Sequence, residues 1–221
     1  MTDLAATLLA RLDAGFSTNR NPDRAEAMAK YMRDQFPYFG VPAPALRTLE
    51  RVAFAGLPPP SEESVREIAL ACWQRPQREF HYVACDYLQR HPPSSLPLLR
   101  ELITTKSWWD TVDPLATRVT GALVRRCPAL AAEMDTWSRD DNLWLVRTAI
   151  LHQLHYGEAT DTARLASYCS HQAGHKDFFV RKAIGWALRH YARTNPDFVR
   201  SFVIETPELS PLSVREATKH L

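Results

Sequence analysis

An indole and a carboxylate lie one helical turn apart in the run Lys106-Ser-Trp-Trp-Asp-Thr-Val-Asp113. Trp109 precedes Asp113 by four residues, and residues four apart share a face of a helix. An electron-rich ring beside an anion is a suitable receptor for a cation. Trp108 points about 100° away from Trp109 on a helix, so the two indoles cannot both face the same core.

Pro114 leaves a structural alternative open for Asp113. A helix that ran through Pro114 would lose a backbone hydrogen bond and clash with the carbonyl group of Asp110. Proline also pushes the residue before it away from helical angles. Asp113 would then lie at a kink or cap a new helix. We therefore expect the one-turn relation between Asp113 and Trp109 to be approximate.

Basic residues accompany tryptophans on later predicted helices. Arg147 follows Trp144, and we interpret it either as a bidentate clamp on a phosphate or as the partner of a carboxylate from an adjacent repeat. Lys182 precedes Trp186 by four residues and Arg189 follows it by three, so all three share one helix face. An indole between two cations suits a polyanion that carries a ring or a cation.

The composition limits the classes of protein to consider. The hydrophobic content of 45% is ample for a core, but the formal charge of +2 is too small to identify a partner. Nucleic-acid binding must therefore be argued from the local placement of Lys and Arg. We expect no cofactor, because the chain has no P-loop, no G-x-S-x-G elbow and no dinucleotide-binding glycine pattern. We expect no metal site, and we expect reduced, buried thiols at four widely spaced cysteines: Cys72, Cys85, Cys127 and Cys169.

The spacing of apolar residues predicts helices almost throughout the chain. Asn21-Pro22-Asp23 predicts a helix start, Phe39-Gly-Val-Pro42 predicts a tight connection, and Ser61 is predicted to cap a further helix. The first residues predict an amphipathic helix without the basic flank or long apolar run of a signal peptide or membrane anchor. We therefore expect a cytosolic protein.

A weak repeat underlies these helices. The run Trp144-Leu-Val-Arg-Thr-Ala-Ile150 matches Phe178-Phe-Val-Arg-Lys-Ala-Ile184 at an offset of 34 residues, and Trp109 lies 35 residues before Trp144. Such a period predicts a helical solenoid of HEAT type, in which stacked helix pairs bury a continuous core and leave one concave surface. A non-repetitive helical bundle is the alternative, because only two copies are clear.

Together these residues resemble the bacterial DNA alkylation-repair glycosylases of AlkD type, which are built from HEAT-like helical repeats. The matching runs occur in order over nearly the whole chain, and the Lys-Ser-Trp-Trp-Asp run is highly specific. They are Met28-Ala-Lys-Tyr-Met32, Phe39-Gly-Val41, Thr105-Lys-Ser-Trp-Trp-Asp-Thr-Val-Asp113, Trp144-Leu-Val-Arg147, Lys182-Ala-Ile-Gly-Trp-Ala-Leu-Arg189 and Pro211-Leu-Ser-Val-Arg-Glu216.

The resemblance implies an all-α fold, a right-handed superhelical solenoid of HEAT-like antiparallel helix pairs with a concave basic face, as one domain over residues 1–221. It implies an enzyme of the bacterial cytosol that removes cationic N3- or N7-alkylated purines from double-stranded DNA without turning the base into a pocket, unlike most glycosylases. We expect a monomer, because a solenoid groove needs no partner subunit. Carried over, Asp113 is the catalytic carboxylate, and Trp109 and Trp186 are the aromatic site residues. Arg147 contacts the DNA backbone and Tyr31 lies near the lesion, while the expected phosphate contacts are Lys106, Lys182 and Arg189.

Two other functions compete with this one. The chain could be a HEAT-type scaffold that binds proteins, but the cations that flank Trp186 disfavour an apolar groove. It could also be a noncatalytic relative that binds bent or branched DNA. The joint presence of Trp109, Asp113, Arg147 and Trp186 disfavours that reading, because loss of catalysis should relax at least one of them.

Overall fold

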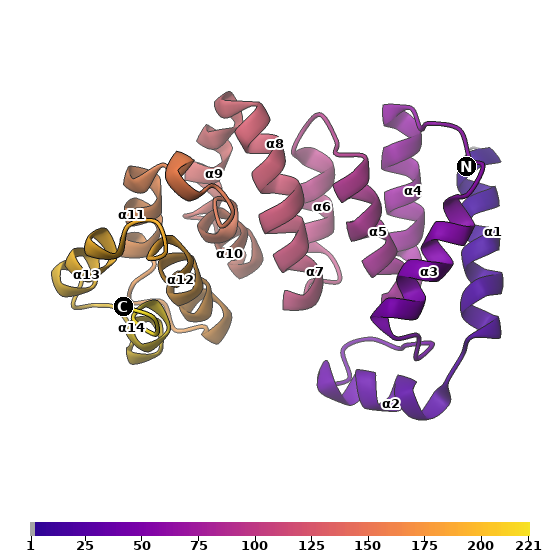
Figure 1. The fold of residues 1–221 in the computed structure, drawn as a ribbon, viewed down its shortest axis with the longest axis horizontal. Coiled ribbons are helices and arrows are strands. Elements are labelled where there is room, and N and C mark those ends of the chain that lie inside the picture. The colour runs from indigo at the N-terminus through magenta and orange to yellow at the C-terminus, as the bar shows by residue number, and fades with distance from the viewer. Residues whose placement is uncertain (1–2) are drawn as a thin grey trace. The chain divides into compact units, whose positions relative to one another are not determined.

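Every regular element in residues 3–221, the part of the chain that the computed structural model describes, is a helix (Figure 1). The predicted all-α class is therefore confirmed. The chain divides into two compact units, the first ending at Ser94 and the second spanning Ser95–Leu221. A single domain over residues 1–221, the handedness of the solenoid and its concave basic face remain predictions.

The helices of the first unit begin at residues that satisfy their first backbone amides. The Asn21 side chain accepts from the amide of Arg24 at 2.9 Å, with Pro22 in the first turn, and Ser61 accepts from the amide of Ser64 at 3.2 Å. Both predicted caps are thus confirmed. The helices of this unit are α1 (Asp3–Thr18), α2 (Pro22–Tyr31), α3 (Ala43–Phe54), α4 (Glu62–Gln74) and α5 (Arg78–Arg90).

The predicted tight connection before α3 is also confirmed. Gly40 has a φ of +88°, and a Cβ atom there would lie 2.1 Å from the carbonyl oxygen of Asn21, so only glycine fits. The fully buried carboxylate of Glu79, on α5, accepts from the amides of Phe39, Gly40 and Val41 at 2.9–3.2 Å. These hydrogen bonds hold residues 39–41 against α5.

The second unit contains the helices on which the candidate site lies. A wide π-helical turn and two short 3₁₀ turns occur among its α-helices. The elements are α6 (Pro97–Thr104), α7 (Trp109–Pro114), the π turn (Leu115–Thr120), α8 (Gly121–Arg126), a 3₁₀ turn (Pro128–Leu130), α9 (Ala131–Trp137), α10 (Leu143–Leu151), a 3₁₀ turn (Gly157–Ala159), α11 (Thr162–His171), α12 (Phe178–Tyr191), α13 (Pro196–Glu205) and α14 (Pro211–Ala217).

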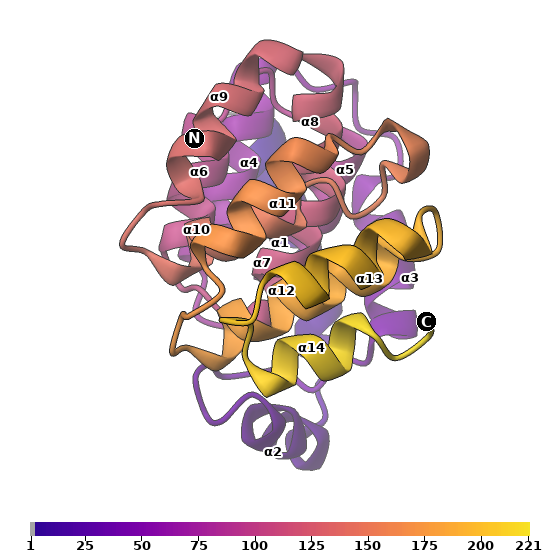
Figure 2. The ribbon, with the colours of Figure 1, turned by 90° about the vertical axis from the view of Figure 1, so that its left-hand side faces the viewer.

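Side-chain contacts in this unit recur at the interval expected from the sequence repeat. Asp113 contacts Arg147, and Lys182 contacts Glu216, in both cases across 34 residues. Within the unit, α10 packs against α7 and α12, and α12 packs in turn against α14 (Figure 2). Residues one repeat apart therefore meet on neighbouring helices, as repeat architectures require.

The cysteines follow the prediction with one exception. All four are reduced; Cys72, Cys85 and Cys169 are buried, whereas Cys127, just after α8, is only half-buried. Burial raises the pKa of the Cys72 and Cys169 thiols to about 12, so these groups remain protonated at neutral pH.

Candidate active site

The helix that carries Asp113 begins directly after an extended residue. Trp108 has φ −158° and ψ 158°, and α7 starts at Trp109. The Trp108 indole packs 5.9 Å from the ring of Trp144 and 5.1 Å from that of Phe179, centroid to centroid. The two neighbouring indoles therefore have separate roles, as predicted: Trp108 joins an aromatic cluster, and Trp109 lines a pocket.

Of the two alternatives expected at Pro114, a kink or a new helix start, the backbone does not show the new start. Pro114 (φ −63°, ψ −38°) and Leu115 (φ −61°, ψ −43°) both have helical angles, and Asp113 lies inside α7 instead of capping a helix. The disturbance appears one residue later as the π turn, in which the amide of Gly121 donates to the carbonyl of Ala116. Trp109 and Asp113 thus keep their one-turn relation.

The carboxylate of Asp113 is held by the guanidinium group of Arg147. Nε donates to Oδ1 at 2.7 Å and Nη2 to Oδ2 at 2.8 Å, while Nη1 donates to the carbonyl of Phe179 at 2.5 Å. Arg147 is only 5% exposed. Of the two interpretations of Arg147, the structure therefore shows the pairing with a carboxylate of the adjacent repeat, and the phosphate contact stays a prediction.

This pairing has opposing effects on the acidity of Asp113. Burial raises the pKa of Asp113 above its ordinary value, while the hydrogen bonds and charge of Arg147 act in the opposite direction. The carboxylate side chain keeps an exposed fraction of 15%. Asp113 is therefore fixed in orientation and still reachable from the pocket.

One pocket of about 220 Å³ brings together six of the eight residues predicted from the sequence. Aromatic rings and charged groups both line it, which is the composition expected of a receptor for a charged ring. Its walls come from α7, α10, α12 and α14, and its lining residues are Trp109, Asp113, Arg147, Phe178, Phe179, Lys182, Trp186, Arg189 and Glu216.

Glu216 is the charged residue of this pocket that sequence reasoning missed. Its carboxylate accepts from Nζ of Lys182 at 2.9 Å and from Nη1 of Arg189 at 2.8 Å. The hydrogen bond from Lys182 is the main reason why the pKa of Glu216 is lowered. The interval of 34 residues from Lys182 to Glu216 equals the interval from Asp113 to Arg147, and that regularity could have identified it.

Comparisons with known proteins identify the family of this chain. The model of the DNA alkylation repair enzyme family matches residues 12–221. This chain belongs to that family. A solved structure described as a predicted DNA alkylation repair enzyme from Enterococcus faecalis is 31% identical, with a TM-score of 0.82 over 91% of this chain and 96% of that one. No curated protein matches the chain.

Membership of the DNA alkylation repair enzyme family supports a role in DNA repair and DNA as the partner. In residues 3–221, no helix has the length and apolarity needed to cross a membrane. The same range holds no group of three or more His, Cys, Asp or Glu side chains arranged for a metal ion.

The remaining two predicted contacts lie outside the pocket lining. Lys106 is exposed in the connection before α7, with a φ of +47°. Tyr31 ends α2 in the first unit and is 73% exposed. The DNA contacts expected of Lys106 and Tyr31 remain predictions. Phe178 and Phe179 were not predicted, although the repeat aligns Phe178 with Trp144.

Proposed function

We propose that this member of the DNA alkylation repair enzyme family is a DNA glycosylase that excises cationic N3- or N7-alkylated purines from duplex DNA. The observation that carries the proposal is the single pocket shared by the Asp113 carboxylate and the indoles of Trp109 and Trp186. An alkylated purine with a positive charge is the ligand that suits two indoles and one anion.

The reaction needs one anion and no general acid. As the bond between C1′ and the purine nitrogen breaks, its electron pair moves to the cationic base, which leaves neutral. Water then adds to C1′ and releases a proton, which Asp113 can accept. Glycoside hydrolysis usually takes a proton for the leaving group from a second carboxylic acid. The second carboxylate here, Glu216, is engaged by Lys182 and Arg189 and its pKa is lowered, which suits a reaction without that acid.

The Arg147 pairing sets the size of the electrostatic effect. Positive charge that develops on the deoxyribose about 4 Å from Asp113 would be stabilised by about 4 kcal/mol at an effective dielectric constant of 20. Arg147 on the far side of the carboxylate, at about 7 Å, would oppose this by about 2 kcal/mol. The net gain of about 2 kcal/mol corresponds to roughly thirtyfold in rate.

The cations of the pocket would hold the DNA backbone. Lys182 and Arg189 lie on α12 beside Trp186, with 38% and 23% of their side chains exposed. A phosphate would compete with Glu216 for them, and such contacts position the duplex without reading its sequence. Trp109 and Trp186 would each add about 0.5–2 kcal/mol by contact with the cationic nucleotide, with no need to turn the base out of the duplex.

A base-release assay tests the proposal. The protein is incubated with duplex DNA that contains 7-methylguanine or 3-methyladenine, and the released base is measured together with binding of undamaged duplex. We expect release of the methylated base and none from undamaged DNA. Binding without release would indicate a noncatalytic DNA-binding relative, and neither binding nor release would indicate a protein-binding scaffold.

A further inference from the structure

A second pocket lies in the first unit, between α3 and α5. Its volume is about 630 Å³, and three arginines and two carboxylates line it. Arg47 and Arg51 lie one turn apart on α3, so both guanidinium groups face the same side of the helix. The complete lining is Arg47, Glu50, Arg51, Phe54, Ala55, Asp86, Gln89 and Arg90.

Glu50 is the buried group at this pocket. It is 1% exposed, and its Oε2 accepts from Nη2 of Arg90 at 2.5 Å. Its other oxygen, Oε1, is buried and has no hydrogen-bond partner among the described residues. A buried polar atom without a partner costs about 1–3 kcal/mol, so a ligand that satisfied it would gain that much in affinity.

The arginines around Glu50 are arranged to receive an anion. Arg90 is held by Glu50 and lies over the ring of Phe54, with its guanidinium carbon 5.2 Å from the ring centroid. Arg47 and Arg51 are exposed, and neither donates a hydrogen bond to another described residue. Three guanidinium groups therefore surround a cavity in which only Glu50 and Asp86 carry negative charge.

We propose that this pocket binds a tetrahedral oxyanion, a phosphate or sulfate group, between Arg47, Arg51 and Arg90, and that binding adds a proton to Glu50, whose Oε1 then donates to the anion. Guanidinium groups are the preferred partners of phosphate oxygens. The same chemistry is offered by a free phosphate and by a phosphodiester of a nucleic-acid backbone. The proposal does not depend on the glycosylase assignment.

The surroundings of Glu50 make such proton uptake accessible at neutral pH. Burial, with a smaller contribution from the charge of Asp86, raises the pKa of Glu50 to about 7, although Arg90 and Arg47 oppose the shift. A bound anion would raise this pKa further, because it adds negative charge. Burial raises the pKa of Cys72 and of Tyr87 to about 12, beyond this range, and burial lowers the pKa of His91.

The sign of the resulting pH dependence follows from linkage. The anion prefers the protonated form of Glu50, whose population falls as pH rises through 7. Affinity should therefore be about tenfold higher at pH 6 than at pH 8, because about nine-tenths of Glu50 is protonated at the lower pH and about one-tenth at the higher.

Sulfate is a suitable probe, because it does not titrate in this range. We would measure sulfate binding to the whole protein by calorimetry at pH 6 and pH 8, in buffers with different ionisation enthalpies that reveal proton uptake. Glu50→Gln, whose amide can donate as the protonated acid does, should bind at pH 8 about as tightly as the wild type does at pH 6, and without pH dependence. Arg51→Ala should lose about tenfold or more at both pH values. Arg20→Ala, an exposed arginine between α1 and α2, is the matched control and should change nothing.

The outcomes separate the alternatives. Absence of sulfate binding, or binding that ignores pH and Glu50→Gln in a folded protein, would overturn the proposal. If the pocket binds as expected, a second titration with undamaged duplex identifies the source of the oxyanion. A loss of duplex affinity in Arg51→Ala at least equal to that for sulfate indicates a phosphodiester, and unchanged duplex affinity indicates a free phosphate.

Discussion

Arg147 partly neutralises the carboxylate on which the proposed chemistry depends. Its fork fixes both oxygens of Asp113, and the same guanidinium group reaches the backbone of α12 through the carbonyl of Phe179. The hydrogen bonds from Arg147 keep the Asp113 carboxylate oriented toward the pocket. The positive charge of Arg147 also reduces the electrostatic stabilisation that Asp113 can give to a developing cation. In the proposed reaction, the indoles of the pocket would consequently supply a larger share of the selectivity for cationic lesions.

Replacement of the Trp186 ring tests the proposed contribution of the indoles to selectivity for cationic lesions. Trp186→Leu keeps an apolar side chain in the pocket but removes the ring that we propose faces the lesion. Loss of about 0.5–2 kcal/mol of cation–π stabilisation should slow release of 7-methylguanine by about 2–30-fold. Single-turnover release measures the change, and Trp186→Phe, which keeps a ring, should lose less. Equal rates for wild type and Trp186→Leu would remove Trp186 from the proposed site.

At the scale of the elements, the close contact between α12 and α14 positions one side of the pocket. Gly185 allows α14 to approach α12, because a Cβ atom at Gly185 would lie 2.4 Å from Cβ of Glu216 and 3.0 Å from the carbonyl oxygen of Ser213. The same approach places Glu216 between Lys182 and Arg189. The positions of Lys182, Arg189 and Glu216 therefore depend on the absence of a side chain at Gly185.

Gly185→Ala should separate α12 from α14. We expect a loss of about 1–3 kcal/mol in the free energy of unfolding, measured with denaturant, because an added methyl group cannot be accommodated there. Gly174→Ala is the matched control, since nothing lies within 4 Å of a Cβ atom at Gly174 and its φ is ordinary. A stable Gly185→Ala protein with an unchanged midpoint would show that α14 is not tightly packed at this position.

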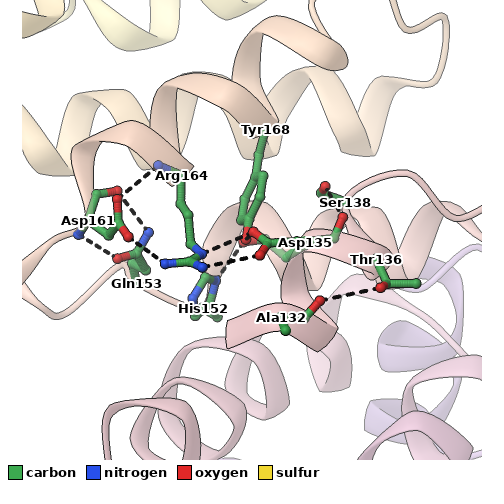
Figure 3. A network of polar contacts seen from close by, with 10 residues as sticks. Ala132, Asp135, Thr136, Ser138, His152, Gln153, Asp161, Arg164 and Tyr168 are labelled. Atoms are coloured by element: carbon green, nitrogen blue, oxygen red, sulfur yellow. Dashed lines mark hydrogen bonds and ion pairs between the residues drawn. The ribbon is translucent and has the colours of Figure 1, made fainter. Parts of the chain in front are cut away.

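A polar network joins α9, the residues directly after α10, and α11 (Figure 3). Arg164 donates to Asp135 and Asp161, and the hydroxyl group of Tyr168 donates to Asp135 at 2.6 Å. His152, which is 1% exposed, lies in the same network, and burial lowers its pKa to about 4. A neutral imidazole is therefore part of the folded structure.

This imidazole should make the protein sensitive to acid. The unfolded chain protonates His152 at about pH 6.5 and the folded chain only at about pH 4, so the stability present above pH 6.5 is lost as pH falls toward 4. Between pH 7 and pH 5 the loss should be about 2 kcal/mol. Denaturant unfolding at both pH values should show this loss in the wild type and in the control His171→Gln. His152→Gln should lack it, and an equal pH dependence in His152→Gln would contradict the assignment.

At the scale of the whole molecule, the sequence predicted what depends on local spacing and on the repeat. The helical class, the caps at Asn21 and Ser61, and the common face of Lys182, Trp186 and Arg189 follow from periodicity. Ion pairs between repeats do not follow from periodicity. Which carboxylate Lys182 contacts depends on how closely α12 and α14 approach each other. For the same reason the sequence left two interpretations of Arg147 open, a phosphate contact and a pairing with a carboxylate of the adjacent repeat.

The small net charge makes the salt dependence of DNA binding a test of local contacts. With a formal charge of +2, long-range attraction is weak, so binding must come from clustered cations such as Lys182 and Arg189. We expect the logarithm of affinity to fall linearly with that of salt concentration, by about 0.9 for each phosphate neutralised. Lys182→Ala should reduce the slope by about 1, whereas the exposed control Lys176→Ala should not. A flat titration would argue against a phosphate-binding site.

The central claim is that Asp113 stabilises the sugar as a charged base departs, and single-turnover release of 7-methylguanine by Asp113→Asn tests it most directly. The variant should bind duplex DNA but excise about a thousandfold more slowly, because it loses the anion and leaves Arg147 unpaired beside the developing cation. Removing that charge as well, in Asp113→Asn with Arg147→Gln, should recover about thirtyfold. Excision by a folded Asp113→Asn protein within about threefold of the wild-type rate would contradict the account.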